Sequence, residues 1–324
     1  MKMISRRHVL NSMAGVAVLS PASLFAQQAP SEVVRVVMPF PPGNPFDATI
    51  RRTVEVIQRQ RPNRTWVVEN KPGAAGIIGT AEVARAKPDG LTLLFTTGGH
   101  TTTAITHRKL PYDPERDFVP ISRLTESAGF VLLVPANSRF RSVQDLVVAA
   151  KEKPDTISYA SAGVGNGTHL VGALFERAAG LKLIHTPYKT LPIPDLIGGH
   201  VDMLFWGSGN SKQLIDDGKV RALAITGSRR WSDMPNLPAL SEFGYQIDVG
   251  AWAGLFAPAG TPEATVEAIY RQVAQAFQDK ELTDWVIRSG STPAISTPAE
   301  FKGFLRREME RYRATITPLG IVVE

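Results

Sequence analysis

Residues 33–47 read VVRVVMPFPPGNPFD, and this stretch decides the fold class. The first six residues form an apolar, β-branched run, which predicts a buried strand. A proline-rich turn follows, in which Gly43 can adopt a positive φ and Asp47 can cap the helix that comes next. A strand that turns directly into a helix is the unit from which helix-covered parallel sheets are built.

The same alternation of strand and helix continues along the chain. Short apolar runs predict strands at 33–39, 66–69, 92–96, 131–134, 156–160, 183–185, 201–205 and 220–226. Segments with a period of 3.6 predict helices at 46–60, 77–87, 142–151, 168–179 and 210–217, with two more that open at Thr261 and Thr297. The expected fold class is therefore α/β.

The length of 324 residues suggests about two domains. No long flexible linker divides the chain, so we expect the chain to cross between domains twice, in the extended stretches 118–134 and 250–257. Residues 27–126 plus 253–324 would then form lobe 1, and residues 127–252 would form an inserted lobe 2. A ligand cleft is expected between the lobes, where the strand ends converge.

The N-terminus has the layout of an export signal. A basic start, an apolar zone at 9–25 and an exit rich in Ala and Gln predict a signal peptide over residues 1–26. The apolar zone is too short for a spanning helix of about 20 residues. SRRHVL at 5–10 matches the twin-arginine pattern, and a general secretory signal is the alternative. We expect a periplasmic protein with the signal removed.

Composition excludes several kinds of chemistry. The chain has no cysteine, which removes disulfides, thiol nucleophiles and metal–thiolate centres. The formal net charge is +6, and Lys2, Arg6 and Arg7 of the signal supply half of it, which leaves 33 basic against 30 acidic residues. This mild excess contains no basic run, so we expect no nucleic-acid partner.

Motifs for catalysis and cofactor binding are absent. The six histidines form no HExxH pattern, so no metal site is expected. GVGNG at 163–167 begins like a dinucleotide loop, but Thr168 stands where the third glycine belongs. The P-loop and the nucleophile elbow are also missing. We expect no catalytic residues and no cofactor, with a periplasmic hydrolase or isomerase as the less favoured alternative.

Four small-residue loops each follow a predicted strand and open a predicted helix, at 39–47, 73–76, 96–102 and 161–168. Backbone N–H groups and a helix N-terminus, which carries about half a positive charge, can hold an anion without Arg or Lys. The hydroxyls of Thr101, Ser161 and Thr168 could add donors or acceptors. A carboxylate is the natural ligand for such loops, and the alternative is that they are only tight turns.

Several motifs, in order, resemble the Bug-type substrate-binding receptors of tripartite tricarboxylate transporters. They are PFPPGNPFD (39–47), VVENKPGAAGIIG (67–79), SAGVGNGTHLVGALFE (161–176), DLIGGHVDMLF (195–205) and WAGLFAPAGTP (252–262). The resemblance implies a periplasmic binding protein of type II topology, with two lobes that each hold a mainly parallel sheet flanked by helices and are joined by two crossing strands. It also implies a non-enzymatic receptor that closes on a small carboxylate and delivers it to a membrane permease.

The resemblance also implies ligand-binding positions, in loops that hold the ligand mainly by main-chain amides and hydroxyls. They are Phe40, Pro41, Gly43, Gly99, His100, Thr101, Ser161, Gly165 and Thr168. We add Asp47, Tyr188 and Trp206 as candidates, although Asp47 would equally serve as a helix cap and Trp206 as hinge packing.

Three departures from the family pattern affect the expected pocket. Asn44 replaces a usual second glycine, the 190–194 segment is short, and Trp206 stands where Asp is common. The bulk of Trp206 would suit a smaller or an aromatic carboxylate. The protein is expected to act as a monomer. A sensor that passes ligand state to a membrane signalling partner is the alternative to a permease receptor.

Overall fold

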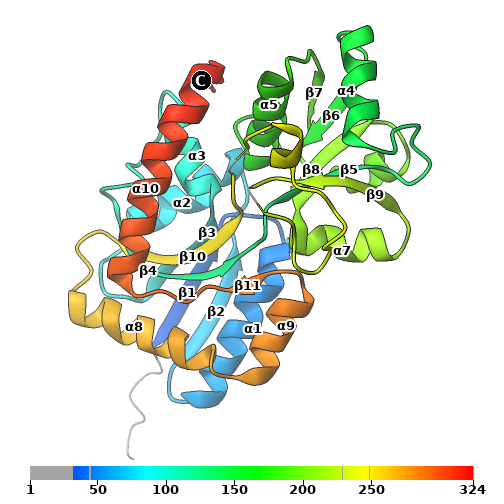
Figure 1. Ribbon diagram of the computed structural model, residues 1–324. Helices are drawn as coiled ribbons and strands as arrows, with labels where there is room; N and C mark the ends of the chain where they lie inside the picture. The colour runs from blue at the N-terminus through cyan, green and yellow to red at the C-terminus, as the bar shows by residue number, and fades with distance from the viewer. Residues whose placement is uncertain (1–31, 44, 228, 248, 324) are drawn as a thin grey trace, which may run out of the picture. The chain divides into compact units, whose positions relative to one another are not determined.

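A computed structural model describes residues 32–43, 45–227, 229–247 and 249–323 of the chain. The expected signal peptide at 1–26 lies outside the described residues. Two β-sheets organise the described part (Figure 1). The first sheet has the order β11-β4-β10-β3-β1-β2, and the second has the order β7-β6-β8-β5-β9.

The strands follow the predicted runs closely. The first sheet contains β1 (Val33–Met38), β2 (Thr65–Asn70), β3 (Thr92–Thr97), β4 (Phe118–Glu126), β10 (Trp252–Pro258) and β11 (Thr292–Pro293). The second contains β5 (Phe130–Pro135), β6 (Ser158–Ser161), β7 (Ile184–Pro187), β8 (Met203–Gly207) and β9 (Val220–Ile225). The sequence missed β4 and β10 as strands and described them only as extended crossings. Pro120 within β4 is the kind of interruption that hides a strand.

Most strands within each sheet run in one direction. In the first sheet β1 pairs in parallel with β2 and β3, while β10 runs antiparallel to both β3 and β4. In the second sheet β6 is parallel to β7 and β8, while β5 is antiparallel to β8 and β9. The chain leaves the first sheet after β4 and returns to it at β10. The expected pair of mainly parallel sheets with two crossings is confirmed.

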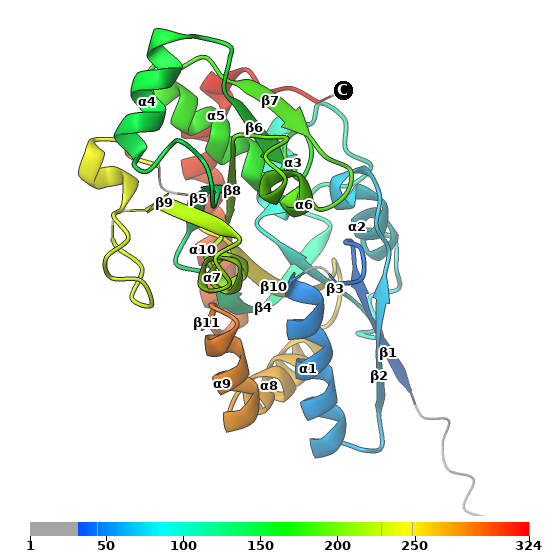
Figure 2. The ribbon, with the colours of Figure 1, turned by 90° about the vertical axis from the view of Figure 1, so that its right-hand side faces the viewer.

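Helices cover both faces of each sheet (Figure 2). The helices that accompany the first sheet are α1 (Pro45–Gln60), α2 (Ile77–Ala84), α3 (Gly99–Thr106), α8 (Glu263–Ala276), α9 (Lys280–Arg288) and α10 (Pro298–Ile316). Those of the second sheet are α4 (Val143–Glu152), α5 (Gly167–Ala179), α6 (Ile193–Ile197) and α7 (Ser208–Asp216). The predicted capping box at Thr297 and Glu300 is present and begins α10. The sequence predicted that the 96–102 loop opens a helix but gave no range for it, because the threonines of α3 have low helix propensity.

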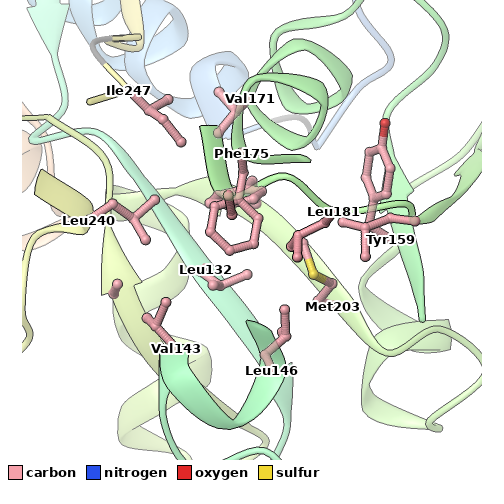
Figure 3. Close-up of a cluster of buried hydrophobic side chains, with 14 of the residues drawn as sticks. Leu132, Val143, Leu146, Tyr159, Val171, Phe175, Leu181, Met203, Leu240 and Ile247 are labelled. Atoms are coloured by element: carbon pink, nitrogen blue, oxygen red, sulfur yellow. The ribbon is translucent and has the colours of Figure 1, made fainter. Parts of the chain in front are cut away.

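Each sheet is buried on both faces, as a near-continuous apolar strand requires. In β1, Val34 and Val36 join a core cluster with α1 and α8, whereas Val37 joins a different cluster on the opposite face. The core of the second sheet gathers around Phe175 of α5, which meets Leu132 and Met203 (Figure 3). Alternation of side chains along each strand therefore supplies both layers of the core.

Helix α10 contributes to the cores of both sheets. Phe301, near its start, is fully buried in a cluster of the first sheet. Tyr312 and Ile316, near its end, belong to the core cluster of the second sheet. Figure 1 shows α10 running past α3 toward α5. Helix α10 therefore packs into both cores and connects them in addition to the two crossings.

Replacing Phe175 with Ala should destabilise the protein by about 3–5 kcal/mol, because the ring is fully buried and its removal leaves a cavity among tightly packed side chains. Urea unfolding followed by circular dichroism would measure the change. Val148→Ala, on the exposed face of α4, is the matched control and should change stability by less than about 0.5 kcal/mol. Equal losses in the two variants would contradict the assigned core.

Candidate functional site

The carboxyl ends of parallel strands bring the predicted loops together at two edges. In the first sheet, β1, β2 and β3 all end at the edge where residues 39–43, the 71–76 loop and the start of α3 lie. In the second sheet, β6, β7 and β8 end at the 161–168 loop, Tyr188 and the start of α7. A Cβ on Gly165 would lie 2.9 Å from Thr106, so the 161–168 loop approaches the C-terminal end of α3.

Elements of both sheets line a cavity of about 380 Å³. Its lining residues are Phe46, Thr49, Trp285, Arg288, Ser289 and Ser291 beside the first sheet, Gly207, Gly209, Asn210, Lys212, Gln213 and Asp216 at α7, and Ser127 and Ala251 in the two crossings. This volume is within the range of small-ligand sites. Because both crossings form part of its wall, any rotation of one sheet against the other would change the shape of the cavity.

The start of α7 reaches the cavity wall through Gly207 and Gly209. No side chain caps the N-terminus of α7, which Gly207 precedes. The buried hydroxyl of Ser208 has no hydrogen-bond partner among the described residues. Arg288 lines the same cavity and forms no ion pair within the described ranges, whereas Lys212 is paired with Asp216 at 2.7 Å. A helix N-terminus and a guanidinium beside one cavity favour an anion.

Two glycines allow α7 to touch the turn that follows α9. A Cβ on Gly209 would lie 2.6 Å from the carbonyl oxygen of Ser289, and a Cβ on Gly290 would lie 2.4 Å from the Cα of Gly209. Real Cβ atoms do not approach so closely, so any larger residue here would push the two segments apart. The second sheet and the first sheet are therefore in backbone contact at one end of the cavity, where Figure 1 shows α7 facing α1 and α9.

The turn between β1 and α1 is held by a polar network. Asp47 accepts hydrogen bonds from Arg51 (3.0 Å), Asn70 (2.9 Å) and the Gly43 amide (3.4 Å), and Asn70 also donates to the Phe40 carbonyl. Burial raises the pKa of Asp47, but these bonds outweigh it and hold the pKa below its usual value. The Asp47 side chain therefore fixes the loop that carries Phe40, Pro41 and Gly43.

The first turn of α3 directs its side chains inward. His100 is buried, its Nε2 donates to the Pro114 carbonyl at 3.0 Å, and its ring contacts Phe118 and Phe256. Burial lowers the pKa of His100 to about 4, so the ring is neutral. Gly98 precedes the helix without a side-chain cap. Any ligand contact by His100 would therefore use its backbone amide.

Thr101 contacts a buried carboxyl, that of Glu308, to which no sequence motif points. Its hydroxyl lies 2.9 Å from Oε2 of Glu308 on α10, and Oε1 of Glu308 accepts from the Trp252 indole at 2.7 Å. Glu308 is only 2% exposed, and this burial raises its pKa to about 7 against the opposing hydrogen bonds. In the sequence Glu308 sits in a charged helix and looks like a solvated surface residue.

The 161–168 loop uses its own polar side chains to hold its shape. Ser161 Oγ lies 2.7 Å from Nε2 of His185, and the Thr168 hydroxyl accepts from the Ala162 amide at 2.9 Å. The Gly165 amide, at φ 76°, donates to Nδ1 of His169 at 3.0 Å. The rings of His169 and His185 stack with centroids 3.9 Å apart. The hydroxyls expected to meet a ligand are thus engaged within the loop.

Tyr188 follows directly after β7, and Trp206 lies in β8. The Tyr188 hydroxyl donates to Asp195 at 2.6 Å, and this bond raises the pKa of Tyr188 to about 12. Trp206 is 9% exposed and belongs to a core cluster against which Tyr188 packs. The structure places the Trp206 side chain in the core of the second sheet, and its expected roles in the cleft wall or the hinge stay predictions.

The sequence missed the cavity residues Thr49, Asn210 and Arg288. The sequence does contain a signal for the start of α7. WGSGN at 206–210 lies between a strand and a helix and is rich in small residues, like the loops at 39–47, 73–76, 96–102 and 161–168. Arg288 carried no such signal. It stands at the end of an ordinary amphipathic helix, and only the tertiary fold brings it to the cavity.

A second hollow, of about 570 Å³, lies beside β9 and is lined by residues of the second sheet and its surroundings, Arg221 among them. The guanidinium of Arg221 donates to the carbonyl oxygens of Ala136, Ser138 and Phe140, so its donors are already used. The cavity that both sheets share is therefore the stronger candidate.

Within the described ranges, no cluster of three or more His, Cys, Asp or Glu side chains is arranged to bind a metal ion. Across the same ranges no helix has the length and apolar character needed to cross a bilayer.

Two sheets with facing loop edges, two crossings and a shared cavity define a two-lobed α/β solute-binding protein. The chain belongs to the tripartite tricarboxylate transporter receptor family, since the family model with that description, TctC, matches residues 50–321. The resemblance drawn from the sequence motifs is confirmed.

Known relatives agree over nearly the whole chain. A UPF0065 protein encoded in the tcbD-tcbE intergenic region of Pseudomonas sp. (strain P51) is 35% identical over 97% of this chain and 94% of its own length. The solved structure of R. palustris Rpa4515 with adipate has a TM-score of 0.84 and 28% identity, and covers 90% of this chain and 99% of that one. The periplasmic binding protein BugD has a TM-score of 0.82 and 30% identity, covering 91% and 100%.

Glu308→Gln should alter how stability depends on pH. The pKa of Glu308 rises from 4.5 to about 7 on folding, so the folded state binds this proton more tightly. The resulting stability is fully present below about pH 4.5 and is lost as the pH rises toward 7. The unfolding free energy of the wild type minus that of E308Q should fall across this window, by at most about 1.4 kcal/mol per pH unit. A constant difference in urea unfolding from pH 4.5 to 8 would contradict it.

Proposed function

We propose that this receptor captures a small carboxylate in the cavity shared by the two sheets. The observation that carries the proposal is the uncapped start of α7, which reaches the cavity wall through Gly207 and Gly209, together with the guanidinium of Arg288 in the same wall. An anion at this position would gain the helix dipole and a charge-assisted hydrogen bond together. The adipate bound to the related Rpa4515 supports a dicarboxylate as the ligand class.

Loops from both edges would complete the site. The second carboxylate of a short diacid would be held by main-chain amides of the strand-end loops, such as those of Phe40 and Gly167. Pro41 and Pro42 have no N–H, and the amides of Gly43 and Gly165 already donate to Asp47 and His169. In this arrangement the side chains of Asp47, His100, Thr101, Ser161 and Thr168 position the loops rather than contact the ligand. Because Trp206 is packed in a core, an aliphatic acid fits the proposal better than an aromatic one.

Ligand binding would favour a closed arrangement of the lobes. Residues 27–126 with 253–324 would move against residues 127–252, about the crossings that contain Ser127 and Ala251. The ligand shifts this equilibrium only by its difference in affinity between open and closed states. Contact between Gly209 and Gly290 would be one of the features that define the closed state.

The receptor would act in the periplasm as a monomer and present its ligand to a membrane permease. The transporter receptor family and the periplasmic relative BugD support this role. Binding would be stoichiometric and without turnover, which separates the receptor from a hydrolase or isomerase. A membrane sensor in place of a permease would be distinguished by which membrane protein co-purifies with the liganded receptor.

Carboxylates should stabilise the mature protein against heat. A ligand present at about 100 times its dissociation constant adds about 2.7 kcal/mol to the free energy of unfolding, because it binds only the folded state. Differential scanning fluorimetry with a panel of adipate, malate and related mono- and dicarboxylates would detect the shift. Matched alcohols and amines are the controls. A panel in which no acid raises the melting temperature would overturn the proposal.

Arg288→Gln should weaken binding of the acid found in that panel by about 10- to 100-fold, since a hydrogen bond to a charged group contributes about 1.5–3 kcal/mol. Isothermal titration calorimetry would measure the change. Arg271→Gln is the control, because Arg271 lies exposed on α8 in an ion pair with Glu267 and should leave affinity unchanged. Equal affinity of the Arg288 variant and the wild type would place the carboxylate elsewhere.

A further inference from the structure

One hydroxyl proton at the start of α3 faces two acceptors. Thr101 Oγ1 lies 2.8 Å from the Gly98 carbonyl oxygen and 2.9 Å from Oε2 of Glu308. A hydroxyl carries a single proton and can donate to only one of them. If Glu308 is protonated, it donates to Thr101, and Thr101 donates to Gly98. If Glu308 is ionised, one of these two short oxygen–oxygen contacts has no proton between its atoms.

The carboxyl of Glu308 is surrounded by hydrogen-bonding and charged groups, and its protonation state decides which of these contacts are favourable. The indole of Trp252, from β10, donates to Oε1, and the Tyr312 hydroxyl also hydrogen-bonds to the carboxyl. Arg311 is the nearest cation, with its guanidinium 4.0 Å from Oε1. On α3 the titratable side chain His100 turns away toward Pro114 and is neutral. No group on α3 or β10 therefore balances a negative charge at Glu308.

Glu308 also stands where three parts of the molecule meet. Thr101 belongs to the first turn of α3, and Trp252 opens the strand by which the chain returns to the first sheet. The Gly98 amide donates to the Trp252 carbonyl at 3.3 Å, which links these two parts directly. One turn beyond Glu308, Tyr312 enters the core of the second sheet.

We propose that Glu308 is a positioning residue whose protonation sets the conformation of the α3 start and thereby the receptor's affinity for carboxylates. The claim deepens the proposed function and rests on it. With Glu308 neutral, the chain of donors from Glu308 through Thr101 to Gly98 is complete. With Glu308 ionised, Thr101 donates to the carboxylate, and its oxygen then repels the Gly98 carbonyl at the start of the helix.

The two forms should differ in affinity in a defined direction. An ionised Glu308 places a negative charge beside the first turn of α3. This charge reduces the positive electrostatic potential that the helix N-terminus would offer to an anion. A carboxylate ligand at the same edge of the sheet is repelled by it. Affinity should therefore fall as the pH rises through neutrality, the range into which burial moves the pKa of Glu308.

The indole N–H resonance of Trp252 gives a test without ligand. In ¹⁵N-edited NMR spectra of the full mature protein, this signal should titrate with a midpoint near pH 7 in the wild type and should not titrate in E308Q. Glu310→Gln, on the exposed side of the same helix, is the control and should titrate like the wild type. A Trp252 signal that does not move in the wild type between pH 5.5 and 8.5 would overturn the proposal without any variant.

Calorimetry with adipate, or with the acid that gives the largest thermal shift, tests the coupling to binding. The dissociation constant of the wild type and of E310Q should rise at least threefold from pH 6 to pH 8, and that of E308Q should stay constant. The same rise in E308Q would overturn the role of Glu308 while leaving the receptor function intact. If no acid binds the wild type at either pH, the receptor function fails and this claim on affinity fails with it.

Discussion

Strands that run in one direction must each turn into a helix at the same edge of a sheet, and this constraint places uncompensated N–H groups side by side. Here it acts twice, at the ends of β1, β2 and β3 and at the ends of β6, β7 and β8. The two crossings line a cavity together with the first turns of α1 and α7 and the end of α9. Recognition of an anion follows from the topology before any particular side chain is considered.

Side chains at this site fall into two groups. Asp47, Ser161, Thr168 and His169 hydrogen-bond to neighbouring protein groups and hold their loops in shape. A buried polar group that had a hydrogen-bond partner only when ligand is bound would destabilise the ligand-free protein. Among the described residues, the Ser208 hydroxyl at the start of α7 has no hydrogen-bond partner, and the exposed Arg288 at the cavity wall forms no ion pair. A rigid, internally satisfied frame around a few open groups is the condition for preorganised binding.

Much of the fold could be predicted from the sequence, because apolar runs and their periods record burial directly. The strands of the second sheet and the capping box of α10 are examples. Side-chain direction could not be predicted. Thr101 and Ser161 were expected to face a ligand, yet their hydroxyls turn to Glu308 and His185. Glu308 and Arg288 look like surface charges in the sequence, and only long-range packing gives them their places.

A crystal structure of the mature protein with adipate, or with the acid that stabilises it most, tests the central claim most directly. The account predicts one carboxylate within about 3 Å of the α7 N-terminus and the guanidinium of Arg288, with the other held by main-chain amides at the first sheet's edge. An acid bound on an outer face, or held only by side chains remote from both strand-end edges, would contradict the account.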